Sequence, residues 1–438
     1  MDKFRKLGIS EEIIKAIEEH KFTEPTEIQV KSIPLVLQGK DVIGGSATGS
    51  GKTLVFGAGI IQNIVKGKGV QALILEPTRE LAEQVCKALQ QFSKYKHLNI
   101  VSIYGGVSIN PQYEDLETAD IVVGTPGRLL DHLTRDTLKS DFIKILVLDE
   151  ADRMLDMGFI DDVEKIIRCI PRKRQTLLFS ATIDGNISYL SRKYMISPVE
   201  IEAEQYVDAT KLHQVYYEVE QHVKFSLLVH LLKQEQSKLV MVFCNTRRNA
   251  DFVSKNLHFA GVDAIAIHGG FSQEKRTRTM SQFSSQKTFV LVCTDIAARG
   301  LDIKGISHVY NYDIPKDDKD YIHRVGRTAR AGKEGKAISL LSQRDFDSFK
   351  RILRNSDLDL KQEPTPRFER VQLRWFEEPK ERGFGKGFQK SGFHGHKREG
   401  RGNYRDKDNR GSRDHRGDHR ERREFSGREH SSSHRRSY

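Results

Sequence analysis

The residues with the clearest chemistry form a small, glycine-rich loop. Residues 46–53 read Ser-Ala-Thr-Gly-Ser-Gly-Lys-Thr and stand between an apolar run and a helix-like segment. Such a loop can turn backbone N–H groups onto phosphate oxygens, and the start of the next helix adds partial positive charge. Lys52 would reach the β- and γ-phosphates, and the Thr53 hydroxyl can ligate Mg²⁺. The predicted nucleotide-binding residues here are Thr48, Gly49, Ser50, Gly51, Lys52 and Thr53, with Ser46 where this pattern usually has glycine.

A second set of chemical groups, Asp149-Glu150-Ala151-Asp152, follows a buried run. In a parallel sheet the C-terminal ends of the strands form the edge where ligands bind. Asp149 is placed to hold Mg²⁺ through water, and Glu150 to orient or deprotonate an attacking water. Acidic residues after a strand also begin helices, so this set gains its meaning from the loop upstream. Together the two sets predict hydrolysis of a nucleoside triphosphate.

Short apolar runs that alternate with helix-like segments must position these groups. Eleven such runs are Asp41–Gly45, Gln71–Glu76, Asn99–Tyr104, Asp120–Gly124, Ile143–Asp149, Gln175–Ser180, Leu239–Cys244, Val262–His268, Thr288–Thr294, Ile306–Tyr312 and Lys336–Leu341. Several are nearly continuous rather than alternating, as expected of parallel strands covered on both faces. Segments 80–93 and 250–260 have apolar residues three or four positions apart, which is typical of crossover helices. We predict an α/β fold with two tandem parallel sheets.

The charge is unevenly distributed along the chain. Of a formal net charge of +12, about +8 lies in residues 378–438, which contain no Ala, Val, Ile, Leu, Met, Cys or Trp. Such a segment cannot offset an ordering entropy of roughly 1–2 kcal/mol per residue, so we predict that it is disordered. The predicted domains are residues 1–205 and 206–360, followed by a polar extension and basic tail over 361–438. Residues 361–377 either pack on the second sheet or bind a partner.

Composition also argues against several classes of protein. The sequence contains no run of 18 apolar residues, so we predict no transmembrane helix. The first residues lack the apolar stretch of a signal peptide. The four cysteines are far apart and form no C-x-x-C pair, which argues against a disulfide framework or a zinc site. A reducing, cytoplasmic location fits this cysteine usage.

Read with their neighbours, these motifs resemble the DEAD-box family of ATP-dependent RNA helicases in superfamily 2. The resemblance covers roughly residues 4–345, with the motifs in family order. It implies two RecA-like domains and ATP with Mg²⁺ as the cofactors. Residues 22–29 resemble the family's Q motif, which implies that Gln29 reads the adenine edge. Phe4, at the upstream aromatic position, would stack on the base, and Phe22 belongs to the same site.

The resemblance also implies RNA contacts and a coupling element. The residues implied to contact the RNA backbone are Thr78, Arg79, Gly106, Thr125, Arg128, Arg276 and Thr294. Ser180-Ala181-Thr182 resembles the motif that couples hydrolysis to unwinding, and Asp152 and His323 are assigned to the same role.

Residues 323–330 are similar to the family's arginine-finger motif. It implies that Arg327 and Arg330 act with Lys52 and Glu150 in catalysis, although Ala329 replaces a usual glycine. Asp302 would face the ATP ribose.

The catalytic residues lie in both predicted domains: Lys52 and Glu150 in the first, Arg327 and Arg330 in the second. This division predicts a two-domain mechanism. An arginine supplied from outside the phosphate-loop domain can contribute roughly 10³–10⁵ in rate. A complete ATPase site therefore exists only when the two domains close on each other. RNA that contacts both domains would favour the same closed state, so ATP and RNA should bind cooperatively. The resemblance adds that closure bends one RNA strand, so that short duplexes and RNA–protein complexes are remodelled locally and without processivity.

The tail resembles arginine/glycine-rich RNA-binding tails, and we expect a sequence-blind RNA tether. A solubilising or phase-separating segment is the alternative. RNA is the expected partner, and ribosome- or RNA-associated proteins are the candidate protein partners. We expect no membrane association and a monomeric protein.

Three alternatives are an ATP-gated RNA clamp or annealing chaperone, a DNA-directed translocase, and a scaffold without activity. The motifs do not separate the first from a helicase. The Q-motif resemblance and the Asp-Glu-Ala-Asp sequence argue against the second, and intact Lys52, Thr53, Glu150 and Arg327 argue against the third.

Overall fold

The computed structural model describes residues 1–45, 50–183, 185–202, 211–235, 238–298, 303, 305–329, 334–354 and 358–375. Contacts along the chain divide it into a unit of residues 1–377 and a unit of residues 378–438. The predicted disordered tail and the predicted domain join at 205/206 lie outside the described residues. No helix of the part described is long and apolar enough to cross a membrane.

The first sheet has seven parallel strands in the order β3-β4-β2-β5-β6-β1-β7. The strands are β1 (Val42–Gly45), β2 (Ala72–Leu75), β3 (Ile100–Ile103), β4 (Ile121–Gly124), β5 (Ile145–Leu148), β6 (Gln175–Ser180) and β7 (Val199–Glu202). Alternate residues of β5 face different cores, Val147 one and Leu146 the other. The sheet is therefore covered on both faces, which explains its continuous apolar runs.

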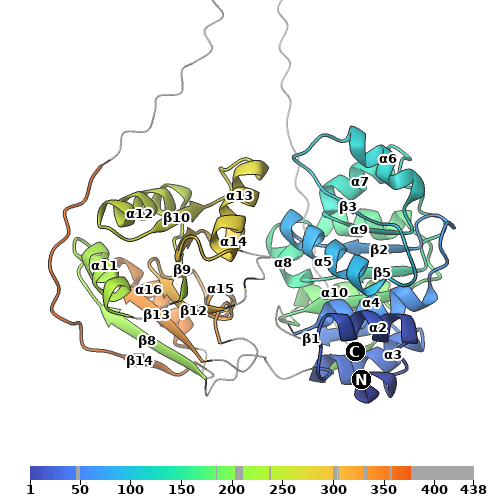
Figure 1. Cartoon of the computed structure of the whole chain (residues 1–438), viewed down its shortest axis with the longest axis horizontal. Helices are drawn as coiled ribbons and strands as arrows, with labels where there is room; N and C mark the ends of the chain where they lie inside the picture. The colour runs from blue at the N-terminus through green and yellow to red at the C-terminus, as the bar shows by residue number, and fades with distance from the viewer. Residues whose placement is uncertain are drawn as a thin grey trace, which may run out of the picture. The chain divides into compact units, whose positions relative to one another are not determined.

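Among the described residues, ten helices accompany this sheet. Figure 1 labels most of them. One core takes its helical side chains from α1 (Asp2–Arg5), α2 (Glu11–Glu19), α3 (Glu27–Leu37), α4 (Lys52–Asn63) and α5 (Arg79–Phe92). The other takes them from α6 (Asn110–Thr118), α7 (Pro126–Thr134), α8 (Ala151–Asp156), α9 (Ile160–Cys169) and α10 (Gly185–Tyr194).

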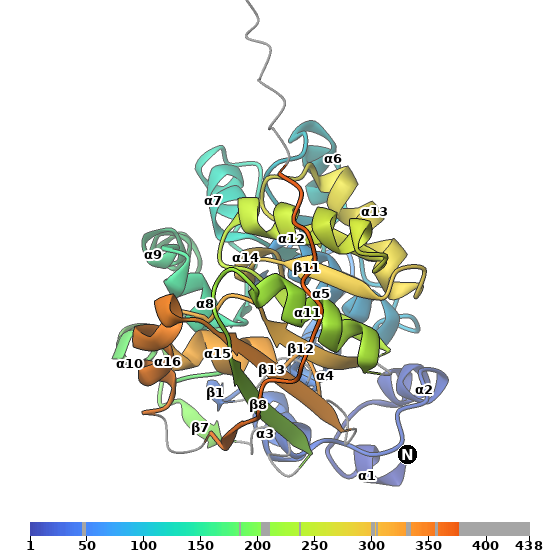
Figure 2. The ribbon, with the colours of Figure 1, turned by 90° about the vertical axis from the view of Figure 1, so that its left-hand side faces the viewer.

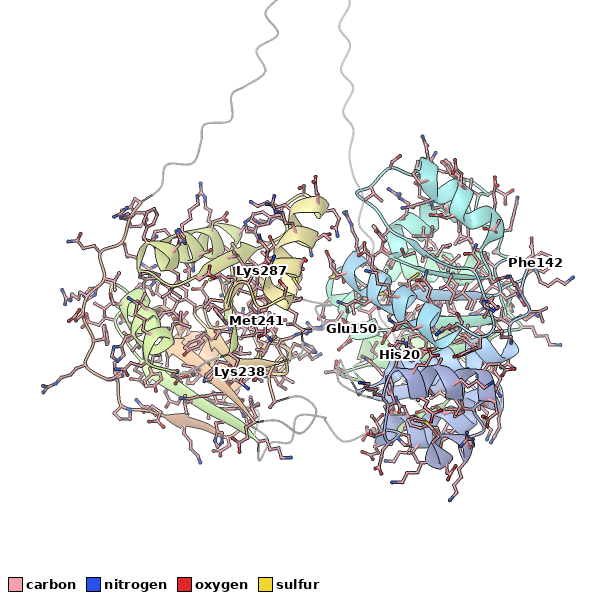
Figure 3. All side chains as sticks on the ribbon, in the orientation of Figure 1. His20, Phe142, Glu150, Lys238, Met241 and Lys287 are labelled. Atoms are coloured by element: carbon pink, nitrogen blue, oxygen red, sulfur yellow. The ribbon has the colours of Figure 1, made fainter. Side chains whose placement is uncertain are left out.

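The second sheet is also seven-stranded and parallel, in the order β10-β11-β9-β12-β13-β8-β14. Its strands are β8 (Leu212–Glu218), β9 (Leu239–Phe243), β10 (Ala264–Ile267), β11 (Val290–Cys293), β12 (Ile306–Asn311), β13 (Gly335–Leu341) and β14 (Leu360–Gln362). Its helices are α11 (Lys224–Gln234), α12 (Arg247–Phe259), α13 (Gln273–Ser284), α14 (Asp295–Ala298), α15 (Asp318–Val325), the 3₁₀ turn η1 (Gln343–Asp345) and α16 (Phe346–Ile352). Met241 of β9, labelled in Figure 3, is fully buried on the face opposite α11 and α12.

All eleven predicted runs contain a strand, and the predicted class of two parallel α/β sheets is confirmed. Sequence reasoning missed β7, β8 and β14. Strands β7 and β14 are edge strands, and the burial of β7 alternates because one side of each pleat meets solvent. Strand β14 crosses the boundary predicted at residue 360.

Residues 363–375 form an extended segment that crosses α11 and α12 (Figure 2, orange to red). Phe368, Val371 and Leu373 pack against the core beneath these helices. The Val371 N–H donates to the Ser226 hydroxyl at 3.0 Å. Of the two alternatives for residues 361–377, packing on the second sheet therefore holds for the part described.

Candidate functional site

The predicted nucleotide site lies at the C-terminal edge of the first sheet, where β1 leads into α4 and β5 into α8. Gly51 precedes α4 with φ of 92°, a backbone conformation that favours glycine. A Cβ at Gly51 would also lie 2.4 Å from the Gln29 amide nitrogen. Thr53 lies in the first turn of α4 and is half-buried. Thr48 and Gly49 lie outside the described residues.

The Q-motif residues hold the phosphate loop. The Gln29 amide donates to the Gly51 carbonyl at 3.0 Å, and the Thr26 hydroxyl donates to the Ser50 carbonyl at 2.9 Å. Gln29 also accepts from the Thr26 N–H at 3.0 Å. Sequence reasoning missed Thr26, although Thr-x-x-Gln at a helix start is a capping-box pattern that could have revealed it. The predicted adenine contact of Gln29 stays a prediction.

The two aromatic residues assigned to the adenine site differ in exposure. Phe4 is fully buried in the core with α2 and α3, so its ring has no face open to a base in this structure. Phe22 is half-buried and packs edge-on against Phe92, with ring centroids 6.1 Å apart. Stacking by Phe4 stays a prediction that requires a rearrangement of the N-terminal residues.

Lys52 and the acidic residues after β5 form one buried cluster. Lys52 Nζ lies 3.2 Å from Asp149 Oδ1, and both side chains are 6% exposed. The same oxygen accepts from the Glu150 N–H at 2.9 Å. Burial lowers the pKa of Lys52, but the charges of Asp149 and Glu150 outweigh it, so the net pKa is raised. For Asp149, burial raises the pKa, and the nearby charge of Lys52 offsets only part of this rise.

Glu150 occupies a strained position. Glu150, labelled in Figure 3, precedes α8 with φ 46° and ψ 48°. This left-handed conformation costs a non-glycine residue about 1–2 kcal/mol. Such strain in a sheet-edge carboxylate is typical of functional sites, where the surrounding fold maintains it.

A further carboxylate, Glu76, lies at the same edge. Leu75 and Leu148 are paired in neighbouring strands, so Glu76 and Asp149 follow them side by side. Glu76 is fully buried, and neither of its carboxylate oxygens has a hydrogen-bond partner. Burial, with added repulsion from Asp149 and Glu150, raises the pKa of Glu76 well above its usual range. Sequence reasoning placed Glu76 only at a strand end; a charged residue closing an apolar run was the available signal.

The predicted coupling residues meet around Asp152. Thr182 Oγ1 donates to Asp152 Oδ2 at 3.4 Å, and Ser180 Oγ donates to the Thr182 carbonyl at 2.6 Å. His323 Nε2 of α15 lies 4.0 Å from the same Asp152 oxygen. One oxygen of Asp152 and His323 Nδ1 are buried without partners. The structure thus joins residues from both sheet regions at this point.

The arginine-rich turn contains two buried arginines with different surroundings. Arg324 forms a two-point ion pair with Asp295, at 2.6 and 2.7 Å, and also donates to Asn245 at 2.7 Å. Arg327 donates to the His323 carbonyl at 3.3 Å and lines a small cavity with Arg153 of α8. Arg324 was not singled out from the sequence, and its partners indicate a structural role. Arg330 and Asp302 lie outside the described residues.

Most of the predicted RNA-contacting residues line one cavity of about 600 Å³. Its lining includes Thr78, Arg79, Thr125, Arg128 and Arg276, whereas Gly106 and Thr294 are outside it. A Cβ at Gly106, where φ is 78°, would lie 2.0 Å from the Arg79 guanidinium. Glycine therefore lets this loop close over Arg79.

An acidic residue also faces this cavity. Arg276 Nη2 lies 2.8 Å from Glu80 Oε1, and Gln273 donates to the same oxygen at 3.4 Å. Sequence reasoning placed Glu80 only at the start of the helix-like segment 80–93. A phosphate that binds Arg276 must therefore compete with the Glu80 carboxylate.

In the part of the chain described, no group of three or more His, Cys, Asp or Glu side chains could hold a metal ion on its own. The four cysteines are free, and three of them are buried. Burial raises the pKa of Cys86 to about 11 and also raises the pKa values of Cys244 and Cys293, so these three thiols are not activated nucleophiles.

Models of known protein families match both sheet regions of the chain. A family model described as DEAD/DEAH box helicase matches residues 26–190, and one described as helicase conserved C-terminal domain matches residues 223–332. The ATP-dependent RNA helicase CshA of Listeria monocytogenes is 48% identical over 350 residues, 79% of this chain and 67% of that protein. The DEAD-box ATP-dependent RNA helicase CshA of Geobacillus kaustophilus is 44% identical over 360 residues, 81% of this chain and 77% of that protein.

Solved structures of similar proteins share the architecture. S. cerevisiae Dbp5 bound to RNA and ADP BeF3 is 31% identical, with a TM-score of 0.75, over 83% of this chain and 96% of that one. Mss116p bound to ssRNA and AMP-PNP is 28% identical, with a TM-score of 0.74, over 82% of this chain and 78% of that one. The predicted pair of RecA-like domains is confirmed. From its family models, its relatives and its fold, the chain belongs to the DEAD-box family of ATP-dependent RNA helicases.

Proposed function

We propose that this RNA-dependent ATPase hydrolyses ATP at the edge of the first sheet, and that Arg327 of the second sheet region completes the site. The observation that carries the proposal is the buried Lys52–Asp149 pair beside the strained Glu150. Lys52 neutralises the β- and γ-phosphates, and Glu150 orients the attacking water and accepts its proton. Ser50 and Gly51 supply the backbone of the phosphate cradle.

The residues present fit a Mg²⁺ ion bound with the nucleotide. Thr53 and Asp149 offer the hard oxygen ligands that Mg²⁺ prefers, and phosphates complete such sites. The cluster also carries more acidic than basic groups, since Lys52 is accompanied by Glu76, Asp149 and Glu150. When bound, Mg²⁺ supplies charge neutralisation between the phosphates.

Contacts between the two sheet regions support coupling of ATP to RNA. Arg153 of α8 and Asp320 of α15 approach to 3.4 Å, near the Asp152–His323 contact. The RNA cavity likewise takes Arg79 from α5 and Arg276 from α13. RNA and ATP would therefore favour the same closed arrangement, in which Thr182 and Asp152 transmit the state of the nucleotide. Strand separation is then local and without processivity.

RNA recognition in this scheme reads the backbone. Arginine binds phosphate oxygens through paired N–H donors, and affinity should fall steeply as salt rises. The Arg/Gly-rich residues 378–438 would act as a tether that raises the local RNA concentration. We also propose a cytoplasmic, monomeric enzyme, in keeping with four free cysteines.

The test is the ATP hydrolysis rate of Arg327→Ala at saturating RNA. We expect RNA-stimulated turnover to fall roughly 10³-fold or more while ATP binding is retained, because the arginine acts on transition-state charge. Arg351→Ala, an exposed arginine of α16, is the matched control and should keep its activity. Undiminished stimulation in Arg327→Ala would show that another group serves as the finger.

A further inference from the structure

Three aromatic residues gather on the outer side of α12 and at the end of the extended segment. Trp375 is 85% exposed and Phe259 is 51% exposed. The Trp375 and Phe252 rings lie 5.3 Å apart with a 39° tilt. The Arg374 guanidinium lies 4.3 Å from the centre of the Phe259 ring. We refer to Phe252, Phe259, Arg374 and Trp375 as the α12 platform.

The backbone beneath the platform is fixed. The Asn256 side chain is 2% exposed and makes two hydrogen bonds with Arg374, accepting from its N–H at 2.8 Å and donating to its carbonyl at 3.2 Å. Leu373 packs into the core just before it. The Trp375 side chain is therefore exposed to solvent next to an anchored stretch of backbone. An exposed indole loses the stabilisation that burial would give, and exposed aromatic side chains of this kind are typical of binding sites.

The chemistry of the platform suits nucleic acid bases beside phosphates. Aromatic rings stack on bases of any sequence, and arginine adds planar stacking and phosphate binding. Lys255 lies between Phe252 and Phe259 on the exposed side of α12, and Arg248 is exposed one turn earlier. The acidic residue of this helix, Asp251, has its Oδ2 2.9 Å from His268 Nε2. Its carboxylate therefore already has a partner.

The helix that carries the platform begins beside the RNA cavity. Arg247, at the start of α12, packs against Gly269, which lines that cavity; a Cβ there would lie 3.3 Å from Arg247 Nη2. Phe252 follows five residues later, about 7.5 Å along the helix at ~1.5 Å per residue. In sequence, the basic residues 378–438 begin three positions after Trp375.

We propose that the α12 platform is a second binding site for single-stranded RNA, which stacks a base on Trp375 and holds the adjacent phosphate with Arg374. The site takes RNA that extends beyond the cavity and requires no bound nucleotide. It gives residues 363–375 a function in substrate binding. The proposal concerns where RNA binds, and it is separate from the assignment of the ATPase residues.

Trp375 reports on this site directly, because it is the only tryptophan in the chain. We expect saturable quenching of its fluorescence when a short oligouridylate is added to the full-length protein without nucleotide. Inorganic polyphosphate of matched charge should bind the basic residues without comparable quenching, since it has no base to stack. Equal quenching by both ligands would overturn the proposal.

A second measurement uses variants and a labelled oligouridylate, read by fluorescence anisotropy. Trp375→Ala should weaken binding roughly fivefold to a hundredfold, the range seen for one stacked base. Trp375→Phe should restore most of the affinity, because it keeps an aromatic face. Phe142→Ala, which removes a 57% exposed ring from the first sheet region (Figure 3), should leave it unchanged.

Unchanged RNA affinity in Trp375→Ala would overturn the proposal and would instead assign this surface to a protein partner. RNA-stimulated ATP hydrolysis by the wild-type chain is measured separately. A failure there would contradict the helicase mechanism and would leave the result for the platform intact.

Discussion

Two carboxylates, one beside each sheet, have pKa values that are shifted in opposite directions. One is buried and the other half-buried. Glu76, after β2, has no partner, and burial raises its pKa well above the usual range. For Glu235, after α11, burial would also raise the pKa, but hydrogen bonds from His308 and Lys336 lower it to about 2. The same residue type therefore stabilises the fold where its charge is paired and destabilises it where its charge is left over.

The cations show the same contrast. Arg324 donates to Asp295, Asn245 and the Asp313 carbonyl, so its buried charge is fully satisfied. Lys52 instead faces an excess of carboxylates. An excess of buried carboxylates destabilises a folded protein unless a ligand neutralises it. Unbalanced buried charge is therefore the physical feature that distinguishes the reactive site around Lys52 from the structural site around Arg324.

Among the variants that test this comparison, Glu150→Gln should have the largest effect. We expect turnover to fall about 10²–10⁴-fold, because the amide keeps the shape but cannot accept a proton. Nucleotide binding should remain, whereas Lys52→Ala should weaken both. Measurement of ATP hydrolysis beside nucleotide affinity separates the two variants, and full hydrolysis by Glu150→Gln would refute its role.

Arg324→Ala should act on stability. Removal of one partner from a buried ion pair leaves the other uncompensated, at a cost of about 3–5 kcal/mol in the free energy of unfolding. Urea unfolding of the variant and of Arg351→Ala, an exposed control, would measure the difference. Equal loss in both variants would mean that Arg324 is not the structural anchor inferred here.

Glu235→Gln should remove a pH-dependent stabilisation. The folded pKa of about 2 lies below the ordinary value of 4.5, so the wild type gains stability above about pH 4.5 and loses it as pH falls toward 2. We expect the variant to be less stable by roughly 1–3 kcal/mol at pH 7. Urea unfolding at pH 7 and pH 3 should show this difference shrink, and a constant difference would contradict the pairing.

Glu76→Gln should give an effect of similar size to that of Glu235→Gln, with the opposite sign. A raised folded pKa costs the wild type stability as pH rises above its ordinary value, because the unfolded chain ionises first. The neutral amide avoids this cost, so the variant should be more stable at pH 8, by about 1–3 kcal/mol, and nearly equal at pH 4.5. Unfolding free energies at both pH values would test it. A wild type that is the more stable at pH 8 would contradict the buried, unpaired carboxylate.

The sequence alone predicted the elements and motifs that depend on local pattern. The runs that became β1 to β6 are buried on both faces and therefore nearly continuous, which makes them easy to recognise. Strand β7, with alternating Val199, Glu200, Ile201 and Glu202, is too short and half-exposed to be recognised without its neighbour β1. Thr26, Glu76 and Glu80 have roles that depend on contacts with residues far away in the chain.

What the sequence determined by itself is the order and spacing of the phosphate loop, the acidic set and the arginine turn, because these are short motifs with fixed backbone needs. Only the tertiary structure decided which charges are balanced. It paired Arg324 with Asp295, left Glu76 without a partner, and placed Gln29 on the Gly51 carbonyl. The energy of a charge depends on burial and on partners, and both arise only when distant segments pack together.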